Sequence, residues 1–575
     1  MSKKTSHVLL RTALAMAIAV LLAATCFASD AVNAVRTSAR IYLNDSPASI
    51  VGYEIGGNNY FKLRDLAYAL KDTTSSFDLA WNAGANRVEV YTQRPYAGVK
   101  EENPASKRTV KAVPASAELT VDGKTVEAAA YEINGNNYYK LRDLSELFSF
   151  SVHWLEESGS ICIYTLDEHT LLTDGTAGST RQMSAPVSTE RWSHLFQSYI
   201  YEDGGDVFYV VEGKPDGVEN AVVVDAYDRE SFVLLMSQEI PIELDVFGGF
   251  FAGETYNYMV FGQDNEEENN KKEVIRIVKY DKDFNRLESA SITGGESFTV
   301  GPFAHGSLRM AENGSELVIH TSRKRYTTED GVNHQSQLTI RLDTDTMQAE
   351  NYMGRFQDNH VSHSFNQFVI FDEGQPVLVD HGDAYPRSIV LSRANGSSYA
   401  KTDLLKIPGE LGANCTGVTI GGFEASASNY LVAINAIDHS KVSAYDNFNM
   451  TGLDQDERDV VLLVQGKDGG KTQEVRLTDY IGVGKLGSTP YLVKLSEDRF
   501  LVLWEEYVYG EGSGTARQGV RCVEVDGDGE TLTEVQSLPN VRLSSDCQPV
   551  FLDGAVTWYV NAKVGRMFYQ IEVED

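Results

Sequence analysis

The sequence is poor in the residues that build disulfide-linked or zinc-bound domains. Only five cysteines occur in 575 residues, at positions 26, 162, 415, 522 and 547, and none forms a Cys-x-x-Cys pair. Cys522 and Cys547 are candidates for neighbours in adjacent strands, and the alternative is isolated, half-buried thiols. The fold must therefore come from apolar burial, and the chain is long enough for two or more domains.

Positive charge is also scarce. The chain has 50 Lys and Arg against 82 Asp and Glu, a formal net charge of −32. A protein that binds nucleic acid needs a basic face, whereas the basic clusters here, 107–111 and 323–325, are short and lie among acidic residues. We therefore expect no nucleic-acid partner. The acidity itself favours solubility and says nothing about the fold.

Long apolar runs are confined to the N-terminus. Basic residues precede the apolar run 13–24, which gives way to small residues. This order predicts a secretory signal peptide and cleavage zone at 1–34, with cleavage after Ala28 or Ala34. The run is too short to span a bilayer, and no other window is apolar enough, so no transmembrane segment is expected after cleavage.

Cys26 raises the alternative of a lipoprotein. The residue before it is Thr25, whereas acylated sites resemble Leu-Ala-Gly-Cys or Leu-Ala-Ala-Cys. We therefore expect a secreted or extracytoplasmic protein, or one associated with the cell surface, without a lipid anchor at Cys26.

The most informative feature is a duplicated fourteen-residue segment. Residues 53–66 recur at 131–144 with two differences, Gly56 against Asn134 and Phe61 against Tyr139. Gly56-Gly57 and Asn134-Gly135 both accept positive φ at two successive residues, which predicts a type I′ hairpin in each copy.

A short helix should follow each hairpin, because apolar residues then fall one turn apart. These residues are Leu66 and Leu70 in the first copy and Leu144 and Phe148 in the second. Two short strands close each copy, at 77–81 and 87–91 and at 151–154 and 161–164. The pattern predicts two ββαββ repeats, 38–93 and 116–166, that pack together as one small α+β domain at 36–166.

The hairpin, the Lys-Leu-Arg-Asp-Leu run and the pairing of repeats resemble the copper amine oxidase-like N-terminal (stalk) domain family of secreted Gram-positive bacterial proteins. The resemblance covers about a quarter of the chain. It implies a non-catalytic appendage, with neither copper nor oxidase chemistry. The Asn-Tyr-Asp or Asn-Tyr-Glu motif from which amine oxidases build their quinone cofactor is absent, so no cofactor is expected.

The remainder of the chain predicts an all-β region. After a linker at 167–190, short β runs recur from 191 to 575, with acidic or Gly-rich turns at 225–228, 281–283, 343–345, 393–396, 466–469 and 526–529. Runs such as 207–211, 258–261, 317–320, 368–371, 430–434 and 500–504 are expected to be the second strands of four-stranded units. A seventh unit, 548–574, supplies three strands. The period predicts a β-propeller of about seven blades, with six or eight as alternatives because 439–459 is a long insertion.

The fourth strand of the last unit has a candidate within 167–190. Residues 181–189 are predicted to return as its outer strand and close the ring, which would remove open sheet edges.

Candidate binding residues are aromatic or imidazole side chains expected in loops at a propeller face. They are Tyr507, Tyr509, Tyr445, Phe448, Tyr256, His360 and His381. Aromatic rings with polar tips suit glycan or peptide recognition, and the alternative is that they pack between strands. No catalytic, cofactor-binding or metal-binding residue is predicted; the acidic loop 526–530 is explained by Asp side chains bonding turn amides.

These observations favour an exported, non-catalytic binding or scaffold protein of the bacterial cell envelope or extracellular space. Its partner would be a glycan, a peptide or another envelope component. The alternative is a hydrolase or lyase that acts on extracellular or cell-wall polysaccharide. An enzyme should show two carboxylates, or a cluster of His and Asp, converging in a central pocket.

Overall fold

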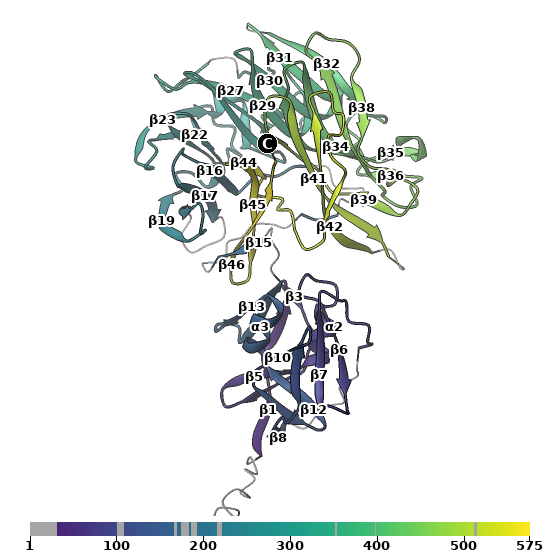
Figure 1. Cartoon of the computed structure of the whole chain (residues 1–575). Coiled ribbons are helices and arrows are strands. Elements are labelled where there is room, and N and C mark those ends of the chain that lie inside the picture. Colours follow the sequence, from purple (N-terminus) through teal and green to yellow (C-terminus); the bar gives the residue numbers. More distant parts are fainter. Residues whose placement is uncertain are drawn as a thin grey trace, which may run out of the picture. The chain divides into compact units, whose positions relative to one another are not determined.

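The computed structural model describes residues 31–100, 108–165, 170–173, 183–185, 192–214, 221–350, 353–396, 398–510 and 514–574. The chain is mostly β and divides into two compact units, 1–167 and 168–575 (Figure 1). None of the helices in these ranges is long and apolar enough to cross a membrane. The predicted signal segment up to residue 30, with Cys26, lies outside the described residues.

Each half of the first unit contains the same elements in the same order. The first half has β1 (Val32–Arg36), β2 (Arg40–Leu43), β3 (Ser46–Pro47), β4 (Gly52–Ile55), β5 (Asn58–Lys62), α2 (Leu63–Leu70), β6 (Phe77–Asn82) and β7 (Arg87–Thr92). The second half has β8 (Thr109–Pro114), β9 (Glu118–Val121), β10 (Lys124–Val126), β11 (Ala130–Ile133), β12 (Asn136–Lys140), α3 (Leu141–Phe148), β13 (Phe150–Leu155) and β14 (Ser160–Thr165). The repeat is therefore longer at its N-terminal end than ββαββ.

The duplicated segment folds as its turn residues require. Gly56 and Gly57 have φ of 56° and 77°, and Asn134 and Gly135 have 50° and 75°, so both hairpins turn through two residues with positive φ. The predicted helix residues Leu66, Leu70, Leu144 and Phe148 all enter one apolar core.

The two halves share their sheets. Strands β1, β4 and β5 form a closed barrel with β8, β11 and β12. Strand β7 pairs in parallel with β9 of the other half, and β14 pairs in parallel with β2. Each of these two sheets thus joins two strands of one half to two strands of the other. Strand β1 starts at Val32 and buries Ala34, so an ordered barrel strand begins inside the region predicted as the cleavage zone.

The second unit is a succession of antiparallel sheets. Its first strands are β15 (Thr170–Leu172), β16 (Ser198–Glu202), β17 (Val207–Lys214), β18 (Ala221–Asp228), β19 (Leu234–Pro241), β20 (Val246–Ala252), β21 (Asn257–Gly262), β22 (Glu273–Tyr280) and β23 (Arg286–Thr293). Then follow α4 (Gly294–Ser297), β24 (Thr299–Pro302), β25 (Leu308–Asn313), β26 (Glu316–Arg325), β27 (Gln335–Asp343), β28 (Gln348–Ala349), β29 (Ser362–Asp372), β30 (Gln375–Ala384), β31 (Arg387–Asn395) and β32 (Ser398–Lys406).

The remaining strands complete the unit. They are β33 (Val418–Ala425), β34 (Asn429–Ala436), β35 (Ala444–Asp446), β36 (Asn449–Thr451), β37 (Asp459–Gly466), β38 (Gln473–Arg476), β39 (Lys485–Gly487), β40 (Tyr491–Lys494), β41 (Arg499–Tyr509), β42 (Thr515–Asp526), β43 (Gln536–Leu538), β44 (Val550–Leu552), β45 (Ala555–Ala562) and β46 (Gly565–Glu572). The predicted insertion 439–459 holds the small β35–β36 sheet and a short 3-10 helix, η1 (His439–Lys441).

Consecutive strands pair in the order predicted from the turns. Sheets β16–β19 and β20–β23 are followed by a nine-stranded sheet, in which β24–β28 and β29–β32 join through one pair, Ser336 with Ser362. The six predicted turns each fall at the end of the third strand of a group; the one predicted at 225–228 lies within β18, which ends at Asp228, and the chain turns just after it. Five of the six runs expected as second strands lie in β17, β21, β26, β34 and β41, but 368–371 lies in β29, the first strand of its group.

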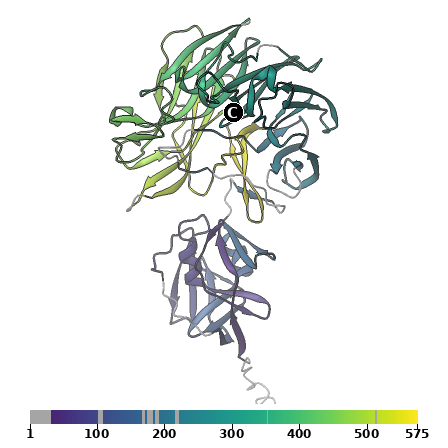
Figure 2. The ribbon, with the colours of Figure 1, turned by 180° about the vertical axis from the view of Figure 1, so that it is seen from behind.

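The sheets follow one another around the unit (Figures 1 and 2). The first strands of neighbouring groups contact each other in sequence, from β20 through β25, β29, β33 and β40 to β44, and β44 contacts β16. Tyr199 of β16 then packs edge-on against Phe250 of β20, which brings the contacts back to the start.

The closing strand is not the predicted one. Thr170–Leu172 pairs antiparallel with β46 and supplies the fourth strand of the sheet β15–β46–β45–β44. It lies inside the predicted 167–190 segment but upstream of 181–189. Of that candidate only 183–185 belongs to the described residues, and these form no strand. A strand of three residues, Thr-Leu-Leu, is too weak a signal to separate it from a linker.

Cys522 and Cys547 do not form a disulfide. The four cysteines within the described ranges, Cys162, Cys415, Cys522 and Cys547, are all buried, and the thiols of Cys522 and Cys547 are free. Burial raises the pKa of the Cys522 and Cys547 thiols to about 12, so both are protonated at neutral pH and behave as small apolar residues.

Glu424 in β33 predicts a pH-dependent stability. Burial raises the pKa of its carboxyl to about 7, and Lys494 only partly opposes the rise. The pKa of the Glu424 carboxyl is higher in the folded than in the unfolded protein. The stability that the neutral, buried carboxyl provides is therefore fully present below about pH 4.5 and is lost as the pH rises through 7. We expect Glu424→Gln to stabilise the protein at pH 8 by about 1–3 kcal/mol and to change little at pH 4. Thermal unfolding at both pH values tests this; an equal effect at both would contradict it.

Candidate functional site

A cavity of about 410 Å³ lies where the first strands of four strand groups meet. Its walls come from β25, β29, β33 and β40, from the C-terminal part of β30, and from four segments outside strands. The lining residues are Met183, Ser184, Trp192, Ser193, His194, Phe196, Arg309, Asn366, His381, Thr419, Ile420, Gly421, Thr489, Tyr491 and Ser545. The volume is in the range that holds a small molecule.

β-Bulges shape two of these walls. The register of β29 against β30 shifts between Ser364 and Gln367, and that of β33 against β34 shifts between Ile420 and Gly422. A bulge bends a strand and re-aims a side chain. Asn366 and Gly421, the residues inside the two shifts, both line the cavity, and the Asn366 amide donates to the Ile420 carbonyl at 2.9 Å.

The composition of the walls differs from that of the chain. Trp192, Phe196 and Tyr491 supply aromatic surface, and Trp192 meets Phe365 edge-on with 4.0 Å between ring centroids. Serine and threonine hydroxyls, an amide, two imidazoles and one guanidinium supply the polar groups. No aspartate or glutamate lines the cavity among the described residues, although the chain has 82 of them.

Arg309 is the cationic group of the cavity. Its guanidinium lies over the Phe196 ring, 3.9 Å from the centroid, and 5.0 Å from that of Phe368. Burial lowers the pKa of Arg309 to about 10, which leaves it charged at neutral pH. Its Nε is buried and has no hydrogen-bond partner within the described part of the chain.

The two cavity histidines have different partners. Nε2 of His381 is 2.9 Å from Oγ1 of Thr416, and burial lowers the pKa of His381 to about 3, so the ring is neutral. Nε2 of His194 is 3.1 Å from the Ser545 carbonyl and 3.1 Å from Oδ1 of the buried Asp546. Asp546 itself does not line the cavity.

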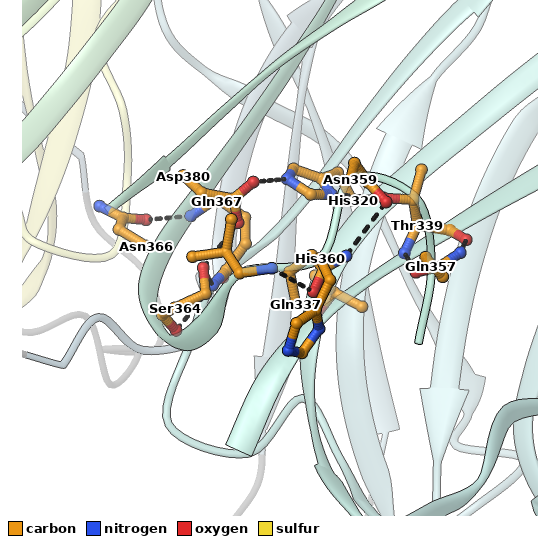
Figure 3. A network of polar contacts seen from close by, with 12 residues as sticks. His320, Gln337, Thr339, Gln357, Asn359, His360, Ser364, Asn366, Gln367 and Asp380 are labelled. Atoms are coloured by element: carbon orange, nitrogen blue, oxygen red, sulfur yellow. Dashed lines mark hydrogen bonds and ion pairs between the residues drawn. The ribbon is translucent and has the colours of Figure 1, made fainter. Parts of the chain in front are cut away.

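Behind Asn366 runs a buried polar network (Figure 3). Asp380 accepts from Ser364 at 2.6 Å and lies 3.1 Å from Nε2 of His320, whose Nδ1 is 3.0 Å from Thr339. Asn359 continues the chain of hydrogen bonds from Thr339 to Gln337. In a catalytic triad the histidine lies between the serine and the aspartate, whereas here Asp380 lies between Ser364 and His320, so no histidine can activate the serine. His320, Ser364 and Asp380 also have no exposed surface. This network specifies packing and offers no reacting group to solvent.

Of the sequence-predicted residues, His381 lies at the cavity. His360 lies elsewhere, edge-on to Phe356, and burial lowers its pKa to about 3, with Arg325 and Arg323 adding to the effect. His363, which the sequence also places near these residues, is 3.4 Å from Asp383. The histidines of this stretch therefore point to separate partners.

None of the predicted aromatic residues lines the cavity, although the Tyr507 hydroxyl donates to the carbonyl of Met183, which does, at 3.3 Å. Tyr507 and Tyr509 are in strand β41 rather than in a loop; Tyr507 is buried and bonded to Glu505, and Tyr509 accepts from the Asp456 amide at 2.8 Å. Tyr445 contacts His439 within the insertion, where Phe448 is 43% exposed. Tyr256 lies under the ammonium group of Lys279. Alternating β patterns do not reveal which aromatic residues fill an interface between sheets.

Trp192 and Arg309 are the site residues that the sequence did not single out. Trp192 is one of only five tryptophans, and it precedes the first full sheet; a rare aromatic residue at that place could have been selected from the sequence. Arg309 occurs in an ordinary alternating strand, Leu308–Asn313, and carries none.

No metal site emerges from the described ranges, in which no group of three or more His, Cys, Asp or Glu side chains could hold an ion. In the acidic turn, Oδ1 of Asp526 accepts from the amides of Asp528 at 3.0 Å and Glu530 at 2.9 Å, which is the turn bonding expected of an aspartate there.

No protein-family model matches the chain, and no curated protein matches it in sequence. Among solved structures it is similar to the β-propeller domain of the Trilobed protease from Pyrococcus furiosus, with 10% identity, a TM-score of 0.35, and coverage of 66% of this chain and 98% of that one. It is also similar to hydrazine synthase from Kuenenia stuttgartiensis, with 9% identity, a TM-score of 0.38, and coverage of 68% of this chain and 99% of that one. For the Dos1 propeller the identity is 10% and the TM-score 0.32, with coverage of 88% of this chain and 95% of that one. Similarities this weak carry no inference about function, and the description of the second unit as a ring of antiparallel sheets rests on its own strand pairing.

Proposed function

We propose that this is an exported, non-catalytic binding or scaffold protein of the bacterial cell envelope or extracellular space. The duplicated module at 36–166 would act as a stalk-like domain, and a seven-bladed β-propeller would bind the ligand in its central cavity. Export rests on the N-terminal sequence pattern. Cleavage after Ala28 fits better than cleavage after Ala34, because Ala34 is a buried residue of barrel strand β1.

The blade count is supported by seven groups of about four antiparallel strands. They are β16–β19, β20–β23, β25–β28, β29–β32, β33–β34 with β37–β38, β40–β43, and β44–β46 with β15. In such a ring the first strand of each blade faces the axis, and four of these strands, β25, β29, β33 and β40, line the cavity.

The observation that carries the binding proposal is the lining of the cavity. Hydrolysis of a glycosidic bond ordinarily needs a pair of carboxylates, and no carboxylate lines this cavity in the described structure. Aromatic surface with hydroxyl, amide and guanidinium groups instead suits recognition of a polar ligand by stacking and hydrogen bonds. Trp192 offers the largest such surface.

A binding screen with the full-length mature protein tests the proposal. Soluble peptidoglycan and polysaccharide fragments would be titrated, and products would be analysed after long incubation. We expect saturable binding without product, and Trp192→Ala should weaken it about tenfold or more. Trp154→Ala, which removes a tryptophan 52% exposed in the other unit, is the matched control and should change nothing. Binding untouched by Trp192→Ala would place the ligand elsewhere.

One feature favours the enzymatic alternative. His194 at the cavity wall, paired with Asp546 at 3.1 Å, has the composition of an acid–base group. If the protein is a hydrolase or lyase acting on extracellular or cell-wall polysaccharide, the same screen should yield product, and His194→Asn should abolish its formation while leaving binding intact.

A further inference from the structure

Arg309 is a half-buried cation without an anion among the described residues. It makes neither an ion pair nor a hydrogen bond with any of them, and its Nε is sealed from solvent without a partner. A guanidinium carries five N–H donors in a rigid fork that matches a carboxylate or a phosphate. The Arg309 side chain lines a cavity that is large enough for a small ligand.

Most other buried arginines in the described part of this unit have partners. Arg387 binds Asp383, Arg458 binds Asp456 and Arg566 binds Glu212. Arg323 donates to backbone carbonyls, including that of Gly354 at 3.0 Å. Arg325 is the exception: its Nε and Nη1 have no partner and its guanidinium lies over the Phe356 ring. Arg325 does not line the cavity, whereas Arg309 does.

Packing accounts for only part of the position of Arg309. The Phe196 and Phe368 rings hold the guanidinium by cation–π contact and fix its plane. Rings accept no in-plane hydrogen bond, so this arrangement orients the fork while leaving its donors unused. A buried charge without a partner lowers the stability of the folded protein, and residues that lower stability in this way are typical of binding sites.

Within the described ranges no acidic side chain lines the cavity, so none of these residues would repel an anion there. Asp546 lies 3.1 Å from His194 but is not one of the lining residues. Hydroxyl groups of Thr419, Thr489 and Ser545 also line it, and can donate to the same oxyanion or to neighbouring ligand hydroxyls.

We propose that Arg309 binds the oxyanion of the ligand, so that the central cavity selects a small carboxylate- or phosphate-bearing molecule, or such a group at the end of a polymer. This rests on the proposed function and names its ligand class. The aromatic walls then hold the uncharged part of the ligand, and the arginine fixes its orientation through two parallel N–H···O bonds.

The test uses the full-length protein and three probes that share one ring. Glucuronate carries a carboxylate, glucose 6-phosphate carries a phosphate, and glucose carries neither; ionic strength is matched with sodium chloride. Thermal unfolding and calorimetric titration are measured for the wild type, Arg309→Met, Arg309→Lys and Arg286→Met. Arg286 lies on an outer strand with its side chain 45% exposed and serves as the control.

We expect one or both anionic probes to raise the Tm of the wild type by more than glucose does. The probe that does so shows whether the cavity binds a carboxylate or a phosphate. Arg309→Met should weaken that binding about tenfold or more, with Arg309→Lys in between. Without probe, Arg309→Met should unfold at a higher temperature than the wild type, because it removes an unpaired buried charge of similar volume. A structural arginine would give the opposite shift.

Three results would overturn the assignment: equal effects of glucose and both anions, an anion effect that survives in Arg309→Met, or a fall in the Tm of ligand-free Arg309→Met. If glycan binding is lost in Trp192→Ala but unchanged in Arg309→Met, the ligand is neutral, and the proposed function stands without an anionic ligand. If nothing binds the cavity, both proposals fail.

Discussion

Replacing Arg566 with methionine should destabilise the second unit by about 3–5 kcal/mol, because the substitution leaves two carboxylates buried without a cation. Arg566 of β46 lies 3.1 Å from Glu212, is bonded to Asp225, and donates to the Tyr227 hydroxyl at 2.7 Å. Arg566, Glu212 and Asp225 are exposed by only 5%, 1% and 4%. Burial alone would lower the pKa of Arg566, but Tyr559 and Glu212 raise it, so the cation is firmly held.

This network joins the last sheet to the first. Glu212 and Asp225 belong to β17 and β18, whereas Arg566 and Tyr559 belong to β46 and β45, and the Tyr559 hydroxyl donates to Glu212 at 3.0 Å. Its loss should therefore open the ring where the two ends of the unit meet. Urea unfolding followed by tryptophan fluorescence measures the effect.

Two controls separate ring closure from a general loss of charge. Arg286→Met removes an exposed ion pair with Glu243 and should cost at most about 1 kcal/mol. Adding Glu212→Gln and Asp225→Asn to Arg566→Met should recover much of the lost stability, because neutral amides carry no unpaired charge. Equal losses for Arg566→Met and Arg286→Met would show that the network does not hold the ring closed.

Gly421→Ala should cost about 3 kcal/mol, the upper end for overpacking, although it adds only one methyl group. A Cβ at this position would lie 1.7 Å from the carbonyl oxygen of Pro490, and that atom belongs to the backbone beside β40. The added carbon can be accommodated only if β33 and β40 separate. Both strands form the cavity wall, so ligand binding should weaken together with stability.

Gly205→Ala provides the matched comparison. Nothing lies within 4 Å of a Cβ built there, and the change should stay within about 0.5 kcal/mol. Chemical denaturation of the two variants in parallel measures the difference. A Gly421→Ala protein as stable as Gly205→Ala would mean that the sheets tolerate a wider spacing than their packing indicates.

Local signals in the sequence predicted much of the fold. A type I′ turn needs positive φ at two successive residues, and Gly56-Gly57 and Asn134-Gly135 adopt it readily. These four residues were therefore enough to predict both hairpins. The turns at 281–283 and 526–529 likewise marked the ends of third strands. By contrast, the parallel pairing of β7 with β9 joins segments whose sequences say nothing about each other.

The candidate site was mostly hidden from the sequence. Its walls come from the inner strands of four strand groups and from segments outside strands, and only their arrangement in space brings Trp192, Arg309 and Tyr491 together. His381 was selected for its chemistry and does lie there, whereas Tyr507 was selected for a loop position that it does not occupy. What identifies Arg309 is the lack of a partner, a property that only coordinates can reveal.

The two halves of the first unit are paired with each other as two identical subunits would be. The pairings of β7 with β9 and of β14 with β2 each join two strands of one copy to two of the other, and β5 pairs with its own counterpart β12 in the barrel. A polypeptide with a single copy would leave both sheets unfinished, and a second identical molecule would supply the missing edges through the same contacts. The duplication thus encloses the geometry of a symmetric homodimer within one chain, and the connection at 93–108 holds the two protomers of that dimer permanently together.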